Sequence, residues 1–236
     1  MQDFISGRRD LIRGDFAHLL DGIKAVAFDL DGTLIDSIGI IIDCTRYAFR
    51  QWNLECPDDA AIMATIGLRL EEGLRQLLPD ERKSEYLEFT ELYRSAYKQN
   101  PRFLIDTTYE DIEPLFVELK KRGIKVGYAS GRSRIGIENT LKNTFLGNYC
   151  DGICAGSEVP SKPDPEMMRV LCERMQVLPE EVLGIGDAGL DIDMFKSAGC
   201  RSLGVQTGVW SGEALLSLSP DYLIPKVSMI PKLLAA

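Results

Sequence analysis

The chain has 236 residues, of which 45% are hydrophobic, and its formal net charge is −9 at pH 7. This length and this apolar share predict a soluble globular protein with one large domain, or with a domain and an insert. The excess of acidic residues argues against nucleic-acid and membrane partners, because nucleic acids and anionic membranes are themselves negative. A small anionic substrate stays possible, since it needs only a local cationic site.

The cysteines and the N-terminal residues indicate a compartment. The six cysteines contain no CxxC pair, and Cys150 and Cys154 are far in sequence from the single histidine, His18. These spacings argue against a zinc site and predict reduced thiols in a cytoplasmic protein. The first fifteen residues hold three aspartates and no apolar segment of the kind that a signal peptide requires. No apolar run approaches the length of a membrane span.

The first part of the chain predicts an extension, a strand and a helical insert. Residues 1–22 are expected to be an N-terminal helical extension, because residues 8–20 carry apolar side chains at roughly helical spacing. The segment KAVAF, residues 24–28, is typical of a buried strand. After Ser37, a favourable N-cap, helical patterns follow one another without a convincing strand. We therefore expect residues 38–103 to form an inserted all-helical domain.

The second part of the chain alternates between strands and helices. Helical patterns begin at Asp111, at Ile135 and at Asp164, where an N-cap is followed by proline. A C-terminal helix closes the chain. Strands are expected at residues 124–129, 152–155, 182–186, 201–205 and 222–224. Such alternation predicts an α/β fold, with an open, Rossmann-like and mostly parallel sheet built from residues 23–37 and 104–236.

Polar side chains stand where three of these strands end. Asp29 and Asp31 follow the first strand, Ser130 ends the second, and Asp187 follows the strand VLGIG. The carboxyl ends of parallel strands meet at one edge of a sheet, where open α/β folds bind ligands. Two further polar residues lie near these strand ends in the sequence: Lys162 and Asp191. One rim of the sheet is thus expected to hold four carboxylates, a hydroxyl and an ammonium group.

The chemistry of this rim indicates a metal and a phosphate. Several carboxylates in one place repel one another unless a cation offsets their charge. Oxygen ligands without a nearby histidine favour a hard ion, most plausibly Mg²⁺. The hydroxyl of Ser130 and the ammonium of Lys162 suit phosphate oxygens, and Gly131 allows backbone N–H groups to approach an anion.

Four segments carry a resemblance to a known family. DLDGTLIDS, YASGRS, SKPDPE and GDAGLDIDMFKSAG occur in the order of the four motifs of the haloacid dehalogenase superfamily. The chain resembles this superfamily from about residue 22 onward. The resemblance implies that Asp29 is a nucleophile that forms an aspartyl-phosphate. It also implies that Asp31 is the general acid for the leaving group and then the base that activates water, for which its pKa should be raised.

The resemblance assigns the other residues of the rim as well. Ser130, Gly131 and Lys162 would bind the phosphoryl group, with Lys162 also pairing with Asp29. The Mg²⁺ ligands would be Asp29, Asp187 and the backbone carbonyl of Asp31. Asp191 would complete or support this metal site.

The position of the insert adds a subgroup and a substrate class. An insert between the first and second motifs resembles the helical C1-type cap of phosphoglycolate phosphatases, similar pyrophosphatases and β-phosphoglucomutases. The expected function is a Mg²⁺-dependent phosphatase that hydrolyses a small phosphorylated metabolite, a phosphomonoester like phosphoglycolate. In the cap segment IGLRLEEGL, Arg69 is either a substrate contact or a solvated surface charge.

Other functions stay open at this point. A phosphomutase would share all four motifs, and a catalytically silent phosphometabolite-binding module would share the fold. The GxGxxG pattern of residues 184–189 also fits a dinucleotide site, but Asp187 would then lie against the pyrophosphate. The physiological substrate, the oligomeric state and the role of residues 1–22 are not determined by the sequence.

Overall fold

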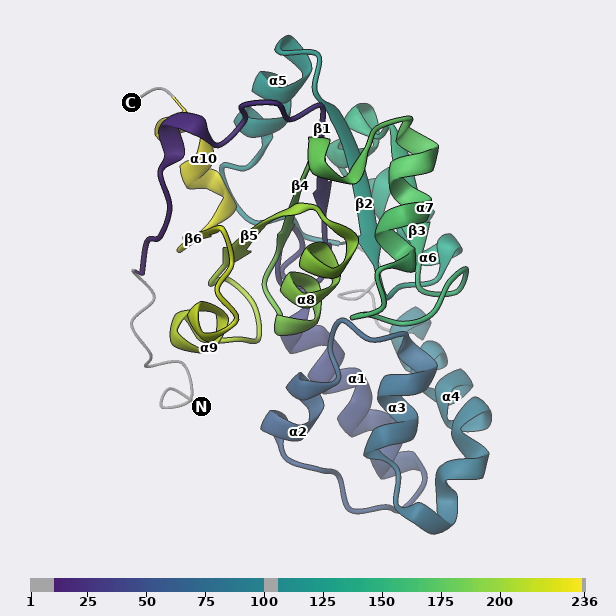
Figure 1. Ribbon diagram of the computed structural model, residues 1–236. Coiled ribbons are helices and arrows are strands. Elements are labelled where there is room, and N and C mark those ends of the chain that lie inside the picture. The colour runs from purple at the N-terminus through teal and green to yellow at the C-terminus, as the bar shows by residue number, and fades with distance from the viewer. Residues whose placement is uncertain (1–10, 100–105, 235–236) are drawn as a thin grey trace.

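The computed structural model describes residues 11–99 and 106–234. Its centre is a six-stranded sheet in the order β3-β2-β1-β4-β5-β6, and every neighbouring pair of strands is parallel (Figure 1). The expected α/β fold with a parallel sheet is therefore confirmed. The strands are β1 Ala25–Phe28, β2 Lys125–Ser130, β3 Gly152–Ala155, β4 Val182–Gly186, β5 Arg201–Val205 and β6 Tyr222–Ile224.

The central strand β1 is buried on both faces, because successive side chains of a strand point to opposite sides. Val26 and Phe28 belong to the hydrophobic core on one face, and Ala25 and Ala27 belong to the core on the other. The neighbouring strands and the helices of the core domain supply further apolar side chains to both layers. These helices are α5 Glu113–Lys121, α6 Arg134–Asn143, α7 Glu166–Met175, α8 Gly189–Ala198, α9 Gly212–Ser217 and α10 Ile230–Leu233.

A second helical layer, the cap, lies beyond the carboxyl ends of the central strands (Figure 1). It has its own hydrophobic core, in which the rings of Phe49 and Phe89 pack edge to face with their centroids 4.9 Å apart. Its helices are α1 Ile38–Gln51, α2 Asp59–Ala64, α3 Leu70–Leu77 and α4 Tyr86–Gln99. The cap is thus a packed unit with its own interior, as the helical periodicity predicts. The exact limits of cap and core, at residues 38 and 103, stay a prediction.

Two paired segments join the cap to the core. The N–H of Asp36 donates to the carbonyl of Thr107, and the N–H of Tyr109 donates to the carbonyl of Leu34, both at 2.9 Å. The chain therefore leaves the core and returns to it along two neighbouring backbone segments. This pairing fixes the base of the cap beside the end of β1.

The structure differs from the expectations at several element boundaries. The first residues of the helix expected over 8–20 lie outside the described part, and the rest hold only a 3₁₀ turn, Phe16–His18. Arg13 instead forms an antiparallel bridge with Leu223 at the edge of the sheet. The helix expected to begin at Pro165, with Asp164 as its N-cap, begins one residue later at Glu166, although the Asp164 carboxylate does accept from the N–H of Glu166 at 2.9 Å.

Helix α9 and the turn Phe145–Tyr149 were not expected from the sequence. The C-terminal helix is a single turn. Within the described residues, no helix combines the length and the apolar character that crossing a membrane requires.

Candidate active site

Five of the predicted site residues meet at the carboxyl edge of the sheet. Asp29 follows β1, Ser130 ends β2, Asp187 follows β4, Asp191 lies in the first turn of α8, and Lys162 comes from the loop before α7. Each has 2% or less of its surface exposed. The parallel register of β1 with β2 and β4 brings the strand ends together, as the sequence predicts.

Lys162 links two of the carboxylates. Its Nζ donates to Oδ1 of Asp29 at 2.6 Å and to Oδ1 of Asp191 at 2.7 Å. Burial alone would lower the pKa of Lys162, but the two carboxylates outweigh it and raise that pKa above its usual value. Lys162 is therefore a fixed positive charge in contact with the nucleophile candidate.

The backbone of two loops encloses Asp187. Thr33 Oγ1 donates to its Oδ1 at 2.7 Å, and the N–H of Val209 donates to its Oδ2 at 3.0 Å. A Cβ atom at Gly208 would lie 1.7 Å from Oδ2, and one at Gly32, whose φ is +87°, would lie 2.6 Å from it. Only glycine allows both loops to come this close. The glycine of the DLDG segment therefore shapes the site as well as the turn.

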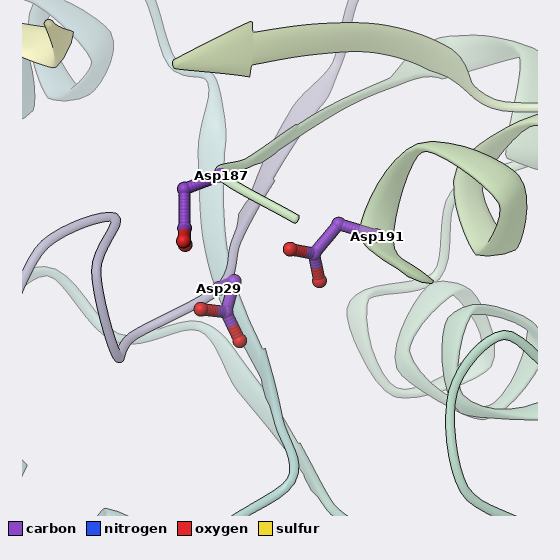
Figure 2. A group of neighbouring side chains, drawn as sticks. All are labelled: Asp29, Asp187 and Asp191. Carbon is purple, nitrogen blue, oxygen red and sulfur yellow. The ribbon is translucent and has the colours of Figure 1, made fainter. Parts of the chain in front are cut away.

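Three buried carboxylates form the group that could hold a metal. One oxygen of each of Asp29, Asp187 and Asp191 lies within 4.8 Å of the others, and Figure 2 shows the three side chains converging. Burial raises the pKa of Asp29 well above its usual range, against the attraction of Lys162. Burial and the neighbouring Asp191 raise the pKa of Asp187 to about 7.

These observations fit a hard divalent cation. Three carboxylates face a single ammonium group, so a bound cation would offset their remaining negative charge. Asp191 has both oxygens engaged, since Lys162 donates to Oδ1 and the N–H of Ala188 donates to Oδ2 at 3.1 Å. Asp187 also has both oxygens engaged, by Thr33 and Val209, so these hydrogen bonds do not rank the two aspartates as metal ligands. The sequence-based assignment, in which Asp29 and Asp187 hold Mg²⁺ and Asp191 supports the site, stays a prediction.

Asp31 is held by an arginine that the sequence analysis did not select. Arg132 Nε donates to Oδ2 of Asp31 at 2.8 Å, and Arg132 Nη2 donates to Oδ1 at 2.5 Å. The hydroxyl of Ser37 donates to the same Oδ1 at 2.6 Å and makes no helix-capping hydrogen bond. Burial alone would raise the pKa of Asp31, but Arg132 and Ser37 outweigh it and lower that pKa. The expected rise is thus wrong for this arrangement, because the expectation omitted Arg132.

Arg132 has further partners. Its Nη1 donates to Oδ2 of Asp106 at 2.9 Å and to Oγ1 of Thr140 at 2.6 Å. Asp106 lies in the segment that returns from the cap, so no local pattern marks it. The sequence did contain a signal that could have identified Arg132 as a site residue, because Arg132 follows Ser130 by two residues in the segment YASGRS.

Ser130 and Gly131 lie where cap and core touch. The Ser130 hydroxyl accepts from the N–H of Arg132 at 3.3 Å. A Cβ atom at Gly131 would lie 2.3 Å from the carbonyl oxygen of Leu68 and 2.7 Å from that of Gly67. Glycine is therefore needed here for the approach of the cap loop. The phosphate-binding roles of Ser130 and Gly131 stay predictions.

Arg69 has a role that neither sequence-based alternative describes. Its Nε donates to the carbonyl of Gly156 at 2.7 Å, and its Nη2 donates to the carbonyl of Val159 at 2.5 Å. Its backbone N–H donates to Oγ of Ser161 at 2.8 Å. Arg69 thus fastens the cap to the loop that carries Lys162. These hydrogen bonds use two of the five N–H groups of the guanidinium, so the sequence-based choice between a substrate contact and a solvated charge stays open.

A parallel sheet with buried carboxylates at its carboxyl edge, under an inserted helical cap, is the architecture of an α/β enzyme with an acidic site. The sequence profile of haloacid dehalogenase-like hydrolases matches residues 26–205. The chain therefore belongs to the haloacid dehalogenase-like hydrolase family.

Individual relatives agree with this membership. The chain is 30% identical to the pyrophosphatase PpaX of Bacillus velezensis, over 87% of this chain and 94% of that one. It is 26% identical to the phosphoglycolate phosphatase of Vibrio cholerae, over 86% and 93%. A haloacid dehalogenase-like family hydrolase of known structure from Streptococcus pneumoniae superimposes with a TM-score of 0.76 at 26% identity, covering 91% of this chain and 98% of that one.

Proposed function

We propose that this protein is a Mg²⁺-dependent phosphatase that cleaves a small phosphomonoester through an aspartyl-phosphate on Asp29. The observation that carries the proposal is the contact of Lys162 Nζ with Oδ1 of Asp29 at 2.6 Å, beside Asp187 and Asp191. This contact orients the Asp29 carboxylate and places a fixed positive charge where phosphoryl oxygens would lie. The relatives named pyrophosphatase and phosphoglycolate phosphatase support phosphate chemistry at this site.

In the first step, an oxygen of Asp29 attacks phosphorus, and the bond between phosphorus and the leaving oxygen breaks. Lys162 and Ser130 stabilise the negative charge on the phosphoryl oxygens as it redistributes. The leaving oxygen takes its proton from Asp31. Asp29, Asp187 and the backbone carbonyl of Asp31 would hold Mg²⁺, which would supply further positive charge to the same oxygens.

In the second step, water attacks phosphorus, and the bond to Asp29 breaks to release inorganic phosphate. The carboxylate of Asp31 takes the proton of the attacking water. The arrangement in the structure corresponds to this base form, because Arg132 and Ser37 hold Asp31 ionised. For the first step Asp31 must carry a proton, so at least part of the Arg132 contact has to be given up when substrate binds.

The test measures phosphate release from a generic aryl phosphate, with Mg²⁺ and with chelator. The Asp29→Asn variant is expected to lose at least about a thousandfold in kcat, since it lacks the nucleophile. Asp193→Asn is the matched control, because Asp193 is an exposed acid on the same helix as Asp191. Full activity of Asp29→Asn would contradict the assignment of Asp29 as the nucleophile. Full activity in the presence of chelator would contradict the proposed requirement for Mg²⁺.

The same assay separates the phosphatase from its alternatives. A phosphomutase would move the phosphoryl group between two positions of one sugar phosphate and release little free phosphate. A silent binding module would bind phosphorylated metabolites without turnover in Mg²⁺. Stoichiometric release of phosphate that depends on Asp29 would support hydrolysis over both.

A further inference from the structure

The candidate active site opens into a large cavity between cap and core. Its volume is about 780 Å³, and it reaches from Asp29 and Asp31 to helices α3, α4 and α6. At roughly 30 Å³ per molecule of liquid water, this is room for on the order of twenty-five waters. Pyrophosphate or phosphoglycolate would fill a small part of it. The size is that of a pocket for a larger organic molecule, which is typically about 300–1,000 Å³.

The arginines that line this cavity already have partners. Arg69 donates to two backbone carbonyls of the core. Arg94 lies between Glu71 and Glu91, with Nη1 donating to Glu91 at 2.5 Å. A second anionic group on a substrate would have to compete with Glu71 and Glu91 for Arg94, whereas the partners of Arg69 are neutral carbonyls.

The third arginine, Arg132, is held in the same way by Asp31 and Asp106. Within the part of the chain that the structure describes, the remaining lining cation apart from these arginines is Lys98, which is exposed at the edge of the cavity. Apart from Asp29, which belongs to the phosphate position, the described lining residues include as many carboxylates as cations. These acids are Asp31, Glu71, Glu91 and Asp106. The cavity outside the phosphate position therefore has no excess of positive charge that would attract a carboxylate or a second phosphate.

Uncharged side chains make up most of the remaining wall. Apolar and aromatic groups come from both layers, and they include Ile41, Leu74, Tyr93, Tyr97 and Ile135. Ile135, in the first turn of α6, has 70% of its surface exposed. Two amides, Asn139 and Asn143, lie on the same helix and also line the cavity. These groups suit an uncharged organic body that carries a few neutral polar atoms.

We propose that the substrate is a phosphomonoester whose alcohol part is uncharged, largely apolar or aromatic, and larger than glycolate. This inference rests on the proposed phosphatase function and adds the substrate class. The phosphate lies at Asp29 and Lys162, and the alcohol part lies against Leu74, Tyr97 and Ile135. Phosphoglycolate and pyrophosphate, whose leaving parts are anionic, are poor substrates under this proposal.

The experiment compares matched esters on the full chain in Mg²⁺. Benzyl phosphate and 4-carboxybenzyl phosphate share the benzyl group and the reacting bond and differ in one carboxylate, and phosphoglycolate and pyrophosphate complete the panel. We expect kcat/KM for benzyl phosphate to exceed that for each anionic compound by about tenfold or more, the size of effect that pocket contacts give. Higher kcat/KM for the anionic compounds would overturn the proposal.

A pair of variants tests the position of the alcohol part. Ile135→Lys adds a cation to the cavity wall, and Leu178→Lys adds one at another exposed position, outside the cavity, where the leucine is 56% exposed. Ile135→Lys is expected to shift the preference toward 4-carboxybenzyl phosphate by about tenfold, and Leu178→Lys to leave it unchanged. An unchanged preference in Ile135→Lys would overturn this placement.

The two levels of inference fail in different ways. Activity that persists in Asp29→Asn would overturn the phosphatase mechanism itself. Activity that depends on Asp29 but favours phosphoglycolate or pyrophosphate would overturn the substrate class alone.

Discussion

The guanidinium of Arg132 joins Asp31, at the carboxyl edge of the sheet, to Asp106 in the segment that returns from the cap. One side chain thus ties the candidate acid–base residue to the domain connection. Both carboxylates are nearly buried, with side-chain exposures of 13% for Asp31 and 10% for Asp106. The position of Asp31 therefore depends on Arg132, in the segment YASGRS, and through it on Asp106, which lies outside the four motifs.

Replacing Arg132 with methionine is expected to destabilise the protein. Asp31 and Asp106 would keep their burial and lose their cation, and breaking a buried pair costs about 3–5 kcal/mol. Urea unfolding at pH 7 measures the loss. Arg132→Lys should recover part of it, because lysine keeps the charge but not the two parallel hydrogen bonds. Equal stability of Arg132→Met and the parent chain would contradict a structural role for this network.

Replacing Lys162 with methionine is expected to lower both stability and activity. Asp29 and Asp191 would be left as buried carboxylates without their ammonium partner, again at about 3–5 kcal/mol. The loss of positive charge at the phosphoryl oxygens should reduce kcat by about 10²- to 10³-fold. Added Mg²⁺ should raise the melting temperature of this variant more than that of the parent chain. An equal rise in both would argue that the ion does not compensate these carboxylates.

Gly208→Ala tests the metal site without removing a ligand. The new Cβ would lie 1.7 Å from Oδ2 of Asp187, so that carboxylate must move. We expect the Mg²⁺ concentration for half-maximal activity to rise by about 10- to 100-fold, the usual effect of disturbing the support of a metal ligand. Gly39→Ala is the control, since a Cβ at Gly39 in α1 meets no atom within 4 Å. If the Mg²⁺ concentration for half-maximal activity were unchanged in Gly208→Ala, Asp187 would not be a metal ligand.

The loop before Lys162 contains an ion pair with a pH signature. Burial would raise the pKa of Glu158, but hydrogen bonds from Arg174, the N–H of Ala155 and Arg134 outweigh it and lower that pKa to about 2. A carboxylate with a lowered pKa stabilises the fold above its unfolded value of about 4.3. That contribution is lost as the pH falls toward 2.

Glu158→Gln should therefore be less stable than the parent chain at pH 7, and the difference should shrink between pH 4.5 and pH 2. Urea midpoints measured across this range check the expectation. A difference that stays constant with pH would assign the effect to packing rather than to charge.

The sequence contains enough information for the sheet and for most of the site. Strands β1, β2 and β4 are short apolar runs, and each leads directly to a predicted site residue: Asp29, Ser130 and Asp187. Parallel order then requires these ends to meet, so their proximity follows from topology alone. Lys162 and Asp191 are found in the same way, from their places beside the strand ends.

Features that depend on distant contacts could not be predicted. The contact of Arg132 with Asp106 depends on where the segment that returns from the cap lies in the fold. No local pattern in the sequence indicates that position. The expected helix over 8–20 failed because Arg13 exchanges backbone hydrogen bonds with Leu223, which offers the backbone a different partner. Apolar spacing is a local signal, and tertiary pairing overrode it here.

The paired segments at Leu34–Tyr109 and Asp36–Thr107 have a consequence for how such a chain can evolve. An insert whose two ends are neighbours can be shortened, lengthened or exchanged, because the host chain could be rejoined there by a tight turn. The carboxyl edge of the sheet would keep its strands, and only the part of the cavity lining that the cap supplies would change. A new substrate specificity can therefore arise by replacement of the cap, while the site residues at the carboxyl edge of the sheet are inherited unchanged.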